Sequence, residues 1–279
     1  MKKVIVSFLL AATSVFPAVS QTYNELCEQA IAATEQDSLQ QAEDLIRQAL
    51  KLEPKNPHNA LLFSNLGTIQ RSQGRLEQAL ESYTFALNFT PRSVPVLLNR
   101  ATLYMEMGKE DHARVDYSLV IDLDKDNQEA LRMRAYIYMK MRDYKLARAD
   151  YLSLLKLNPT DFNGRLGLAT LEQKEGKYPE ALALLNGLLT DKDYTQRETQ
   201  AVLYVARAGV EIDAGQPDLA LIDLEEAIKL DASQAEAYLM RGQLYLSQQK
   251  KKLAKEDLEK AVSLGVAPGD VRDLLQQCK

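Results

Sequence analysis

The side chains most able to carry out chemistry are few in this chain and stand apart from one another. Only two histidines occur, His58 and His112, and neither has a partner at the spacing of a metal site or a catalytic triad. Two Gly-Lys pairs, at 108–109 and 176–177, lack the glycine five residues earlier that a phosphate-binding loop requires. The sequence therefore predicts no catalytic residue, no cofactor and no metal site.

An acidic stretch, DLDKDNQE at 122–129, comes nearest to a metal-binding motif. A twelve-residue calcium loop beginning at Asp122 needs glycine at its sixth position and glutamate at its twelfth. The chain has Asn127 and Met133 there. The stretch is therefore interpreted as a turn between helices.

The first twenty residues, MKKVIVSFLLAATSVFPAVS, have the parts of a secretory signal peptide. Lys2 and Lys3 precede an apolar run, which is shorter than the roughly 20 residues that span a bilayer. Small side chains at Ala18 and Ser20 predict cleavage before Gln21. An uncleaved membrane anchor is the alternative, but we expect an exported protein without a transmembrane segment after cleavage.

Charge and cysteine content narrow the possible partners. Removing the two lysines of the signal takes the formal net charge from −5 to −7, so no basic surface for nucleic acid is expected. An oxidising compartment permits disulfides, yet Cys27 and Cys278 stand at opposite ends of the mature chain. We therefore expect no disulfide between Cys27 and Cys278 within one chain. Either Cys278 forms a disulfide with a second copy of the chain, or both thiols are free. Whether the chain self-associates stays open.

A repeated pattern organises the remaining residues. Alanines recur at intervals of 37, 34, 34, 34, 39 and 34 residues, each inside a helix-turn-helix pattern of apolar residues: Ala42, Ala79, Ala113, Ala147, Ala181, Ala220 and Ala254. The eighth position of each unit is small, and the twenty-fourth is bulky. A large residue at the eighth position would push the two helices beyond their usual separation of about 8 to 10 Å.

This pattern resembles the tetratricopeptide repeat. The resemblance implies an all-α, right-handed superhelical solenoid of about seven helix-turn-helix units, followed by a capping helix at 269–279. The units are read at 23–56, 60–93, 94–127, 128–161, 162–195, 201–234 and 235–268. The solenoid therefore occupies residues 21–268, after the signal peptide at 1–20. Its stability comes from stacking, because one hairpin cannot bury its apolar face alone.

Four of the units carry an arginine at the seventh position and an aspartate at the twenty-third. The pairs are Arg100 with Asp116, Arg134 with Asp150, Arg207 with Asp223, and Arg241 with Asp257. The other three units have neither charge at these positions. Because the two positions face each other across the hairpin, we hypothesise structural salt bridges that clamp one helix to the other.

The resemblance also implies a partner-binding groove, lined by the second, fifth, ninth and twelfth positions of each first helix. These positions hold Ser64, Thr68, Arg71, Leu98, Thr102, Met105, Arg132, Tyr136, Met139, Leu166, Thr170, Gln173, Val205, Ile212, Leu239, Gln243 and Leu246. Methionine, tyrosine and arginine suit protein contacts. The candidate anchor residues are therefore Arg132, Tyr136, Met139, Met105 and Leu98, although the same residues could simply pack against neighbouring helices.

The sequence thus predicts a non-catalytic scaffold that binds a protein or peptide in the bacterial cell envelope, most simply in the periplasm. A secreted or surface-attached adaptor is one alternative. An enzyme or small-molecule binder that uses the groove is a second alternative from another class. No arrangement of nucleophile, base and orienting group supports the enzyme.

Overall fold

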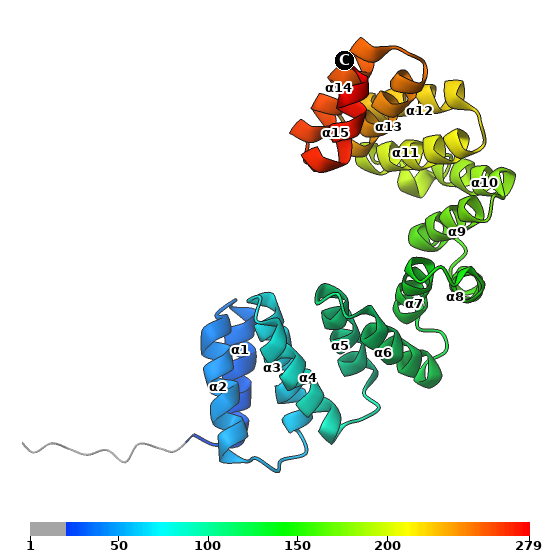
Figure 1. Ribbon diagram of the computed structural model, residues 1–279. Helices are drawn as coiled ribbons and strands as arrows, with labels where there is room; N and C mark the ends of the chain where they lie inside the picture. Colours follow the sequence, from blue (N-terminus) through cyan, green and yellow to red (C-terminus); the bar gives the residue numbers. More distant parts are fainter. Residues whose placement is uncertain (1–20) are drawn as a thin grey trace, which may run out of the picture. The chain divides into compact units, whose positions relative to one another are not determined.

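A computed structural model describes residues 21–279, and the predicted signal peptide at 1–20 lies outside the described residues. From residue 21 onwards all regular secondary structure is helical, with fifteen α-helices, one short 3₁₀ helix and no strand (Figure 1). The all-α solenoid predicted from the sequence is confirmed. No helix in this part of the chain combines the length and apolar character needed to cross a bilayer.

Each unit of the repeat pattern corresponds to two α-helices. The first helices are α1 (Tyr23–Glu35), α3 (Asn59–Ser72), α5 (Val94–Glu106), α7 (Gln128–Lys140), α9 (Phe162–Lys174), α11 (Arg197–Asp213) and α13 (Ala235–Ser247). The second helices are α2 (Leu39–Leu52), α4 (Leu76–Phe89), α6 (Glu110–Leu123), α8 (Tyr144–Leu157), α10 (Tyr178–Leu189), α12 (Pro217–Leu230) and α14 (Lys251–Ser263). The 3₁₀ helix η1 (Lys192–Tyr194) precedes α11, and α15 (Pro268–Gln277) follows α14. Helix α3 begins one residue before the predicted unit at 60–93, and α11 begins four residues before the one at 201–234.

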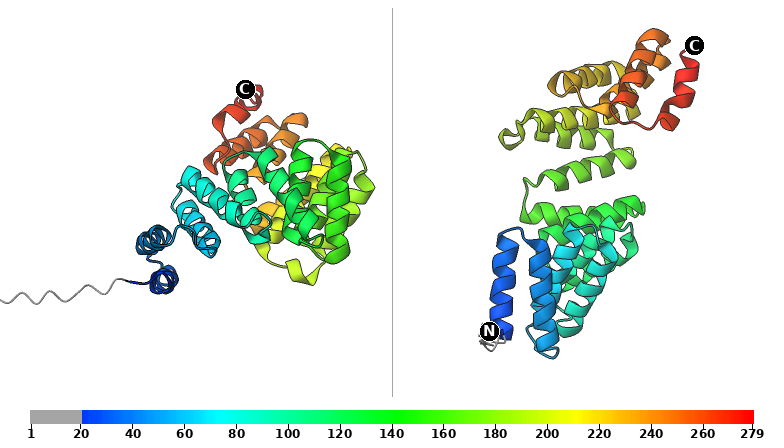
Figure 2. Two further views of the ribbon diagram at one scale, coloured as in Figure 1. Left: turned by 90° about the horizontal axis from the view of Figure 1, so that it is seen from below. Right: turned by 90° about the vertical axis from the view of Figure 1, so that its left-hand side faces the viewer.

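The helices form two compact units. The first ends at Leu103 and the second runs from Tyr104 to Lys279, so that the boundary falls within α5. In the first unit α1 packs against α2, and α3 packs against α4; Figure 2 shows α1 and α2 side by side. In the second unit each helix from α6 to α15 contacts the next, which buries an apolar face at every step.

The tight turn inside each hairpin has one residue in the left-handed region of backbone space. Glycine occupies this position in four hairpins, at Gly74, Gly108, Gly176 and Gly215, where φ lies between 68° and 75°. The other three hairpins have Asp37, Arg142 and Gln249 there, with φ from 56° to 61°. A glycine accepts this conformation without the steric cost that a side chain adds.

The core between the two helices of a hairpin depends on small residues. All seven repeating alanines have no solvent exposure. At Gly67 an added Cβ would lie 2.8 Å from the ring of Tyr83, which is itself fully buried. The close approach of the helices therefore requires the small residue, as the sequence pattern indicates.

Candidate functional site

Two first helices of the second unit, α7 and α9, together with Tyr151 of the second helix α8, line a hollow of about 580 Å³, here called the Tyr151 pocket. Its lining comes from α7, α8 and α9 and comprises Arg132, Met133, Tyr136, Met139, Tyr151, Asn163, Leu166, Gly167 and Thr170. Most of this surface is apolar. Arg132 is the single charged residue of the lining.

Tyr151 and Gly167 together form the floor of the Tyr151 pocket. A Cβ added to Gly167 would lie 2.4 to 2.6 Å from the end of the Tyr151 side chain, including its hydroxyl oxygen. Tyr151 is only 4% exposed, and its burial raises the pKa of the phenol to about 12. The hydroxyl therefore stays protonated at any physiological pH.

Arg132 is tied to its surroundings by Asp161. Its guanidinium donates a hydrogen bond of 3.0 Å to Oδ2 of this buried carboxylate. The other oxygen, Oδ1, accepts a 2.7 Å hydrogen bond from the backbone N–H of Gly164 and caps the amino end of α9. The charge of Arg132 is therefore balanced within the chain, whereas its buried Nε has no hydrogen-bond partner among residues 21–279.

A second hollow, of about 300 Å³, adjoins the Tyr151 pocket and shares Leu166 and Thr170 with it. It lies between α9, α11 and α13, and its further lining residues are Ala169, Gln173, Leu185, Val205, Ala206, Gly209, Val210, Glu236 and Met240. Gln173 donates a 2.7 Å hydrogen bond to Asp213 across its edge. The two hollows together are called the first-helix groove below.

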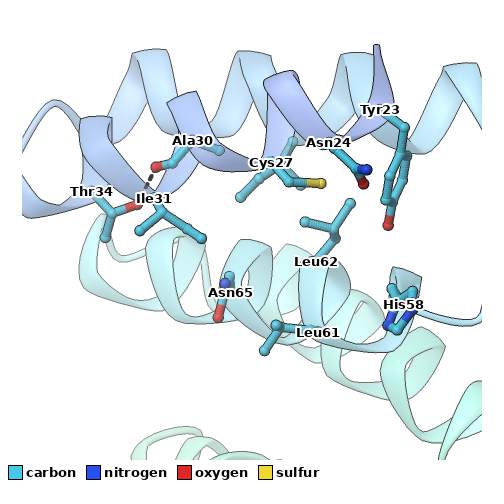
Figure 3. A pocket seen from close by; sticks show the side chains of 11 residues that line it. Tyr23, Asn24, Cys27, Ala30, Ile31, Thr34, His58, Leu61, Leu62 and Asn65 are labelled. Carbon is cyan, nitrogen blue, oxygen red and sulfur yellow. Dashed lines mark hydrogen bonds between the residues drawn. The ribbon is translucent and has the colours of Figure 1, made fainter.

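The first unit has a smaller hollow of its own, about 220 Å³ in volume, between α1 and α3. Figure 3 shows Asn24, Cys27 and Ile31 of α1 opposite Leu61 and Asn65 of α3. Cys27 is a free thiol, as is Cys278. Burial raises the pKa of the Cys27 thiol, so the unreactive protonated form is favoured.

The structure brings together three of the five candidate anchor residues, Arg132, Tyr136 and Met139, in the Tyr151 pocket. Met105 is half-buried on α5 and is not part of this lining. Leu98 belongs to the other compact unit, so its place beside these residues stays a prediction. The sequence pattern identifies Tyr151 only as the bulky twenty-fourth residue of the unit at 128–161, so it does not indicate the floor of the pocket.

Three of the four hypothesised arginine–aspartate pairs form two-pronged ion pairs. The pairs are Arg134 with Asp150, at 2.8 and 2.8 Å, Arg207 with Asp223, at 2.6 and 2.7 Å, and Arg241 with Asp257, at 2.7 and 2.9 Å. The hydrogen bonds to the aspartates raise the pKa of each arginine. The residues of the fourth pair, Arg100 and Asp116, belong to different compact units, so this pair stays a prediction.

Two of these arginines also contact the preceding repeat, which the sequence pattern did not indicate. Arg134 donates a 3.2 Å hydrogen bond to Ser118 on α6, and Arg207 donates one of 2.7 Å to Asn186 on α10. These contacts leave the groove free and link successive hairpins. The arginines therefore serve the architecture of the solenoid.

The two histidines are separate in the structure as well. His112 packs against the ring of Tyr104 at 5.1 Å between centroids, and His58 precedes α3 at the edge of the hollow in the first unit. Between residues 21 and 279, no three His, Cys, Asp or Glu side chains gather closely enough to hold a metal ion.

Comparison with known families decides what this arrangement of hairpins is. Two family models, both described as tetratricopeptide repeat, match the chain, one over residues 27–93 and 132–195 and the other over 94–127 and 235–264. The chain belongs to the tetratricopeptide repeat family. Tetratricopeptide repeat proteins act as protein-interaction scaffolds and bind protein partners or peptides.

Solved structures of similar proteins agree with this assignment. A tetratricopeptide repeat protein from Parabacteroides merdae is 34% identical, with 92% of this chain and 98% of that chain covered and a TM-score of 0.75. YrrB, described as a TPR protein with an unusual peptide-binding site, is 19% identical, with 69% and 95% covered and a TM-score of 0.56. Cut9–Hcn1, a hetero-tetramer of APC/C, is 17% identical, with 92% and 48% covered and a TM-score of 0.66.

YrrB and Cut9–Hcn1 show the shared fold alone, because their identities are low. A search of curated proteins finds no match.

Proposed function

We propose that this tetratricopeptide repeat protein is a non-catalytic scaffold of the bacterial cell envelope that binds an extended protein segment in its first-helix groove. The observation that carries the proposal is the adjoining pair of hollows, which share Leu166 and Thr170. Together they extend over first helices from α7 to α13. A continuous, mostly apolar surface of this kind suits a peptide better than a compact small molecule.

The electrostatics of the groove support binding over catalysis. Among its lining residues, Arg132 is already paired with Asp161, and Glu236 is the only carboxylate. General acid–base catalysis needs two positioned groups, and nucleophilic catalysis needs a base beside the nucleophile. YrrB, with its unusual peptide-binding site, is an example of a protein of this fold that binds a peptide.

The groove is tested by selecting peptides from a random phage-displayed library on the immobilised protein. Enriched peptides are then synthesised and titrated by fluorescence anisotropy against the wild type and the double variant Tyr136→Ala, Met139→Ala. We expect the double variant to weaken binding at least about tenfold, since truncating two anchors in an interface costs more than about 1.4 kcal/mol.

A matched control removes two apolar side chains from a second helix. Leu219 and Ile222 on α12 are 49% and 62% exposed and lie outside both hollows. The variant Leu219→Ala, Ile222→Ala should leave the affinity unchanged. Equal loss in both double variants, or no enriched peptide at all, would contradict the proposed groove.

The location in the envelope has its own test. The signal peptide expected at 1–20 is the feature that supports export. Fractionation of bacterial cells that express the full chain, followed by mass spectrometry of its amino terminus, should find a periplasmic protein that begins at Gln21. Recovery in the cytoplasm with Met1 intact would contradict export, and recovery in the medium would favour the secreted adaptor.

A further inference from the structure

The hydroxyl of Tyr151 faces the pocket and makes no hydrogen bond to the residues that the structure describes. Tyr151 as a whole is only 4% exposed, yet its hydroxyl oxygen is not fully enclosed and keeps contact with the pocket. A buried tyrosine hydroxyl normally finds a hydrogen-bond partner, because losing one costs about 1 to 3 kcal/mol. A ligand that fills the pocket would cover this hydroxyl and would therefore have to supply its hydrogen-bond partner.

The geometry aims this hydroxyl into the pocket. Its oxygen lies 2.5 Å from the point where Gly167 would carry a Cβ, and Gly167 is part of the lining. The corresponding position of the preceding repeat holds Met133, whose long side chain forms part of the wall of the pocket. Only the missing side chain at Gly167 leaves the hydroxyl uncovered.

The walls of the pocket suit an aromatic ring. Met133 and Met139 supply thioethers, Tyr136 supplies a ring that is 47% exposed, and Leu166 supplies aliphatic surface. Thioethers make favourable contacts with aromatic rings, and two rings attract each other in offset or edge-to-face arrangements. The volume of about 580 Å³ accommodates the largest amino-acid side chains.

Charge complementarity favours a neutral side chain. No acidic residue belongs to the lining, so a lysine or arginine of a ligand would lose its hydration without compensation. Arg132 is paired with Asp161, so a carboxylate would have to compete with an ion pair that is already formed. A neutral ring with a hydrogen-bonding tip therefore fits this pocket best.

We propose that the Tyr151 pocket binds a tyrosine side chain of the partner segment, with the ring between Tyr136 and the two methionines and the phenol hydrogen-bonded to the hydroxyl of Tyr151. This inference rests on the proposed function of the first-helix groove. It makes Tyr151 the residue that distinguishes tyrosine from phenylalanine. A phenylalanine in the same place would cover the hydroxyl and leave it without any partner.

The experiment uses the peptides enriched from the random library, each synthesised with tyrosine and with phenylalanine at the selected anchor position. Against the wild-type protein, replacing tyrosine by phenylalanine should weaken binding about tenfold or more, because a buried polar group is left unsatisfied. Against Tyr151→Phe, the two peptides should bind with equal affinity. The comparison in the wild type does not depend on the folding of any variant.

Tyr117→Phe is the matched control. Tyr117 occupies the equivalent position of the preceding repeat, is fully buried on α6, and does not belong to the pocket lining. This variant should keep the preference for tyrosine over phenylalanine. If Tyr117→Phe and Tyr151→Phe both lose the preference for the tyrosine peptide, the loss reflects general destabilisation of the protein, and the proposed role of Tyr151 is overturned.

The outcomes separate this inference from the proposed function. Peptides that depend on Tyr136 and Met139 but carry leucine, phenylalanine or another residue at the anchor overturn the tyrosine proposal and leave the groove in place. Equal affinity of the tyrosine and phenylalanine peptides for the wild-type protein would likewise overturn the tyrosine proposal and leave the groove in place. If the enriched peptides bind the double variant Tyr136→Ala, Met139→Ala with the same affinity as the wild type, the proposed groove itself is overturned.

Discussion

The carboxyl group of Glu211 on α11 lies beside the carboxylate of Asp223 on α12, and the two are held very differently. Asp223 accepts hydrogen bonds of 2.6 and 2.7 Å from Arg207, whereas Oε2 of the buried Glu211 has no partner among residues 21–279. Burial, followed by the charge of Asp223, raises the pKa of Glu211 from its ordinary value of 4.5 to about 7. Between about pH 4.5 and pH 7 the folded protein therefore holds a proton on Glu211, whereas the unfolded chain releases it.

This proton makes the free energy of unfolding depend on pH. Because the folded-state pKa is raised, the contribution of Glu211 is favourable below about 4.5 and is lost as the pH rises towards and through about 7. We predict that Glu211→Gln, which stays neutral, raises the free energy of unfolding at pH 8 by about 1 to 3 kcal/mol. The gain should shrink towards pH 4.5. Urea denaturation of both proteins across this range measures it.

Glu172 provides a control of opposite sign at the equivalent position of the preceding repeat. Its carboxylate accepts hydrogen bonds from Arg148, which lower the pKa of Glu172. A lowered pKa gives stability that is present at neutral pH and lost as the pH falls through the ordinary range. Glu172→Gln should therefore destabilise the protein at pH 8. Equal effects of the two substitutions would contradict this account of the two carboxyl groups.

The ion pair between Arg134 and Asp150 gives a further prediction. Asp150 is buried, and the two hydrogen bonds between the side chains both measure 2.8 Å. Removing either partner leaves a buried charge, so Arg134→Met and Asp150→Leu should each lower the free energy of unfolding by about 3 kcal/mol. The double variant should lose much less than the sum. Strict additivity in a double-mutant cycle would contradict a coupled pair.

The fold could be predicted because one pattern recurs along the chain, so that each repeat supports the interpretation of the others. Positions that face one another within a single hairpin, such as Arg134 and Asp150, follow from the same register. The surroundings of Arg132 could not be predicted in this way. The sequence suggests that its charge is available to a partner, but Asp161, at the start of the next hairpin, forms an ion pair with it. Contacts between hairpins depend on how the repeats stack, which no single repeat records.

The Tyr151 pocket was only half predictable for the same reason. Tyr136 and Met139 came from the register of the first helix, and the structure places both in the lining. The exposure of the Tyr151 hydroxyl depends on the absence of a side chain at Gly167, which belongs to another repeat. A glycine inside a helical pattern was the available signal, because such a residue often marks a close approach.

Two glycines on neighbouring first helices give the last prediction, because alanine should affect stability in opposite directions. At Gly209 on α11 the nearest atoms to an added Cβ are the Met240 methyl at 3.6 Å and the Gln173 amide nitrogen at 3.7 Å, which are ordinary contacts. Alanine favours the helix by up to about 1 kcal/mol over glycine. Gly209→Ala should therefore stabilise the protein by roughly that amount.

At Gly167 on α9 the added Cβ would lie 2.4 Å from Cζ of Tyr151, whose ring is enclosed by the core. The ring must move, and overpacking of this kind costs about 1 to 3 kcal/mol, which exceeds the gain in helix propensity. Gly167→Ala should therefore lower the midpoint of urea denaturation, whereas Gly209→Ala raises it. Because the new methyl group also covers the Tyr151 hydroxyl, Gly167→Ala should abolish the preference for a tyrosine peptide. A stable Gly167→Ala protein that retains this preference would show that the hydroxyl does not reach the ligand.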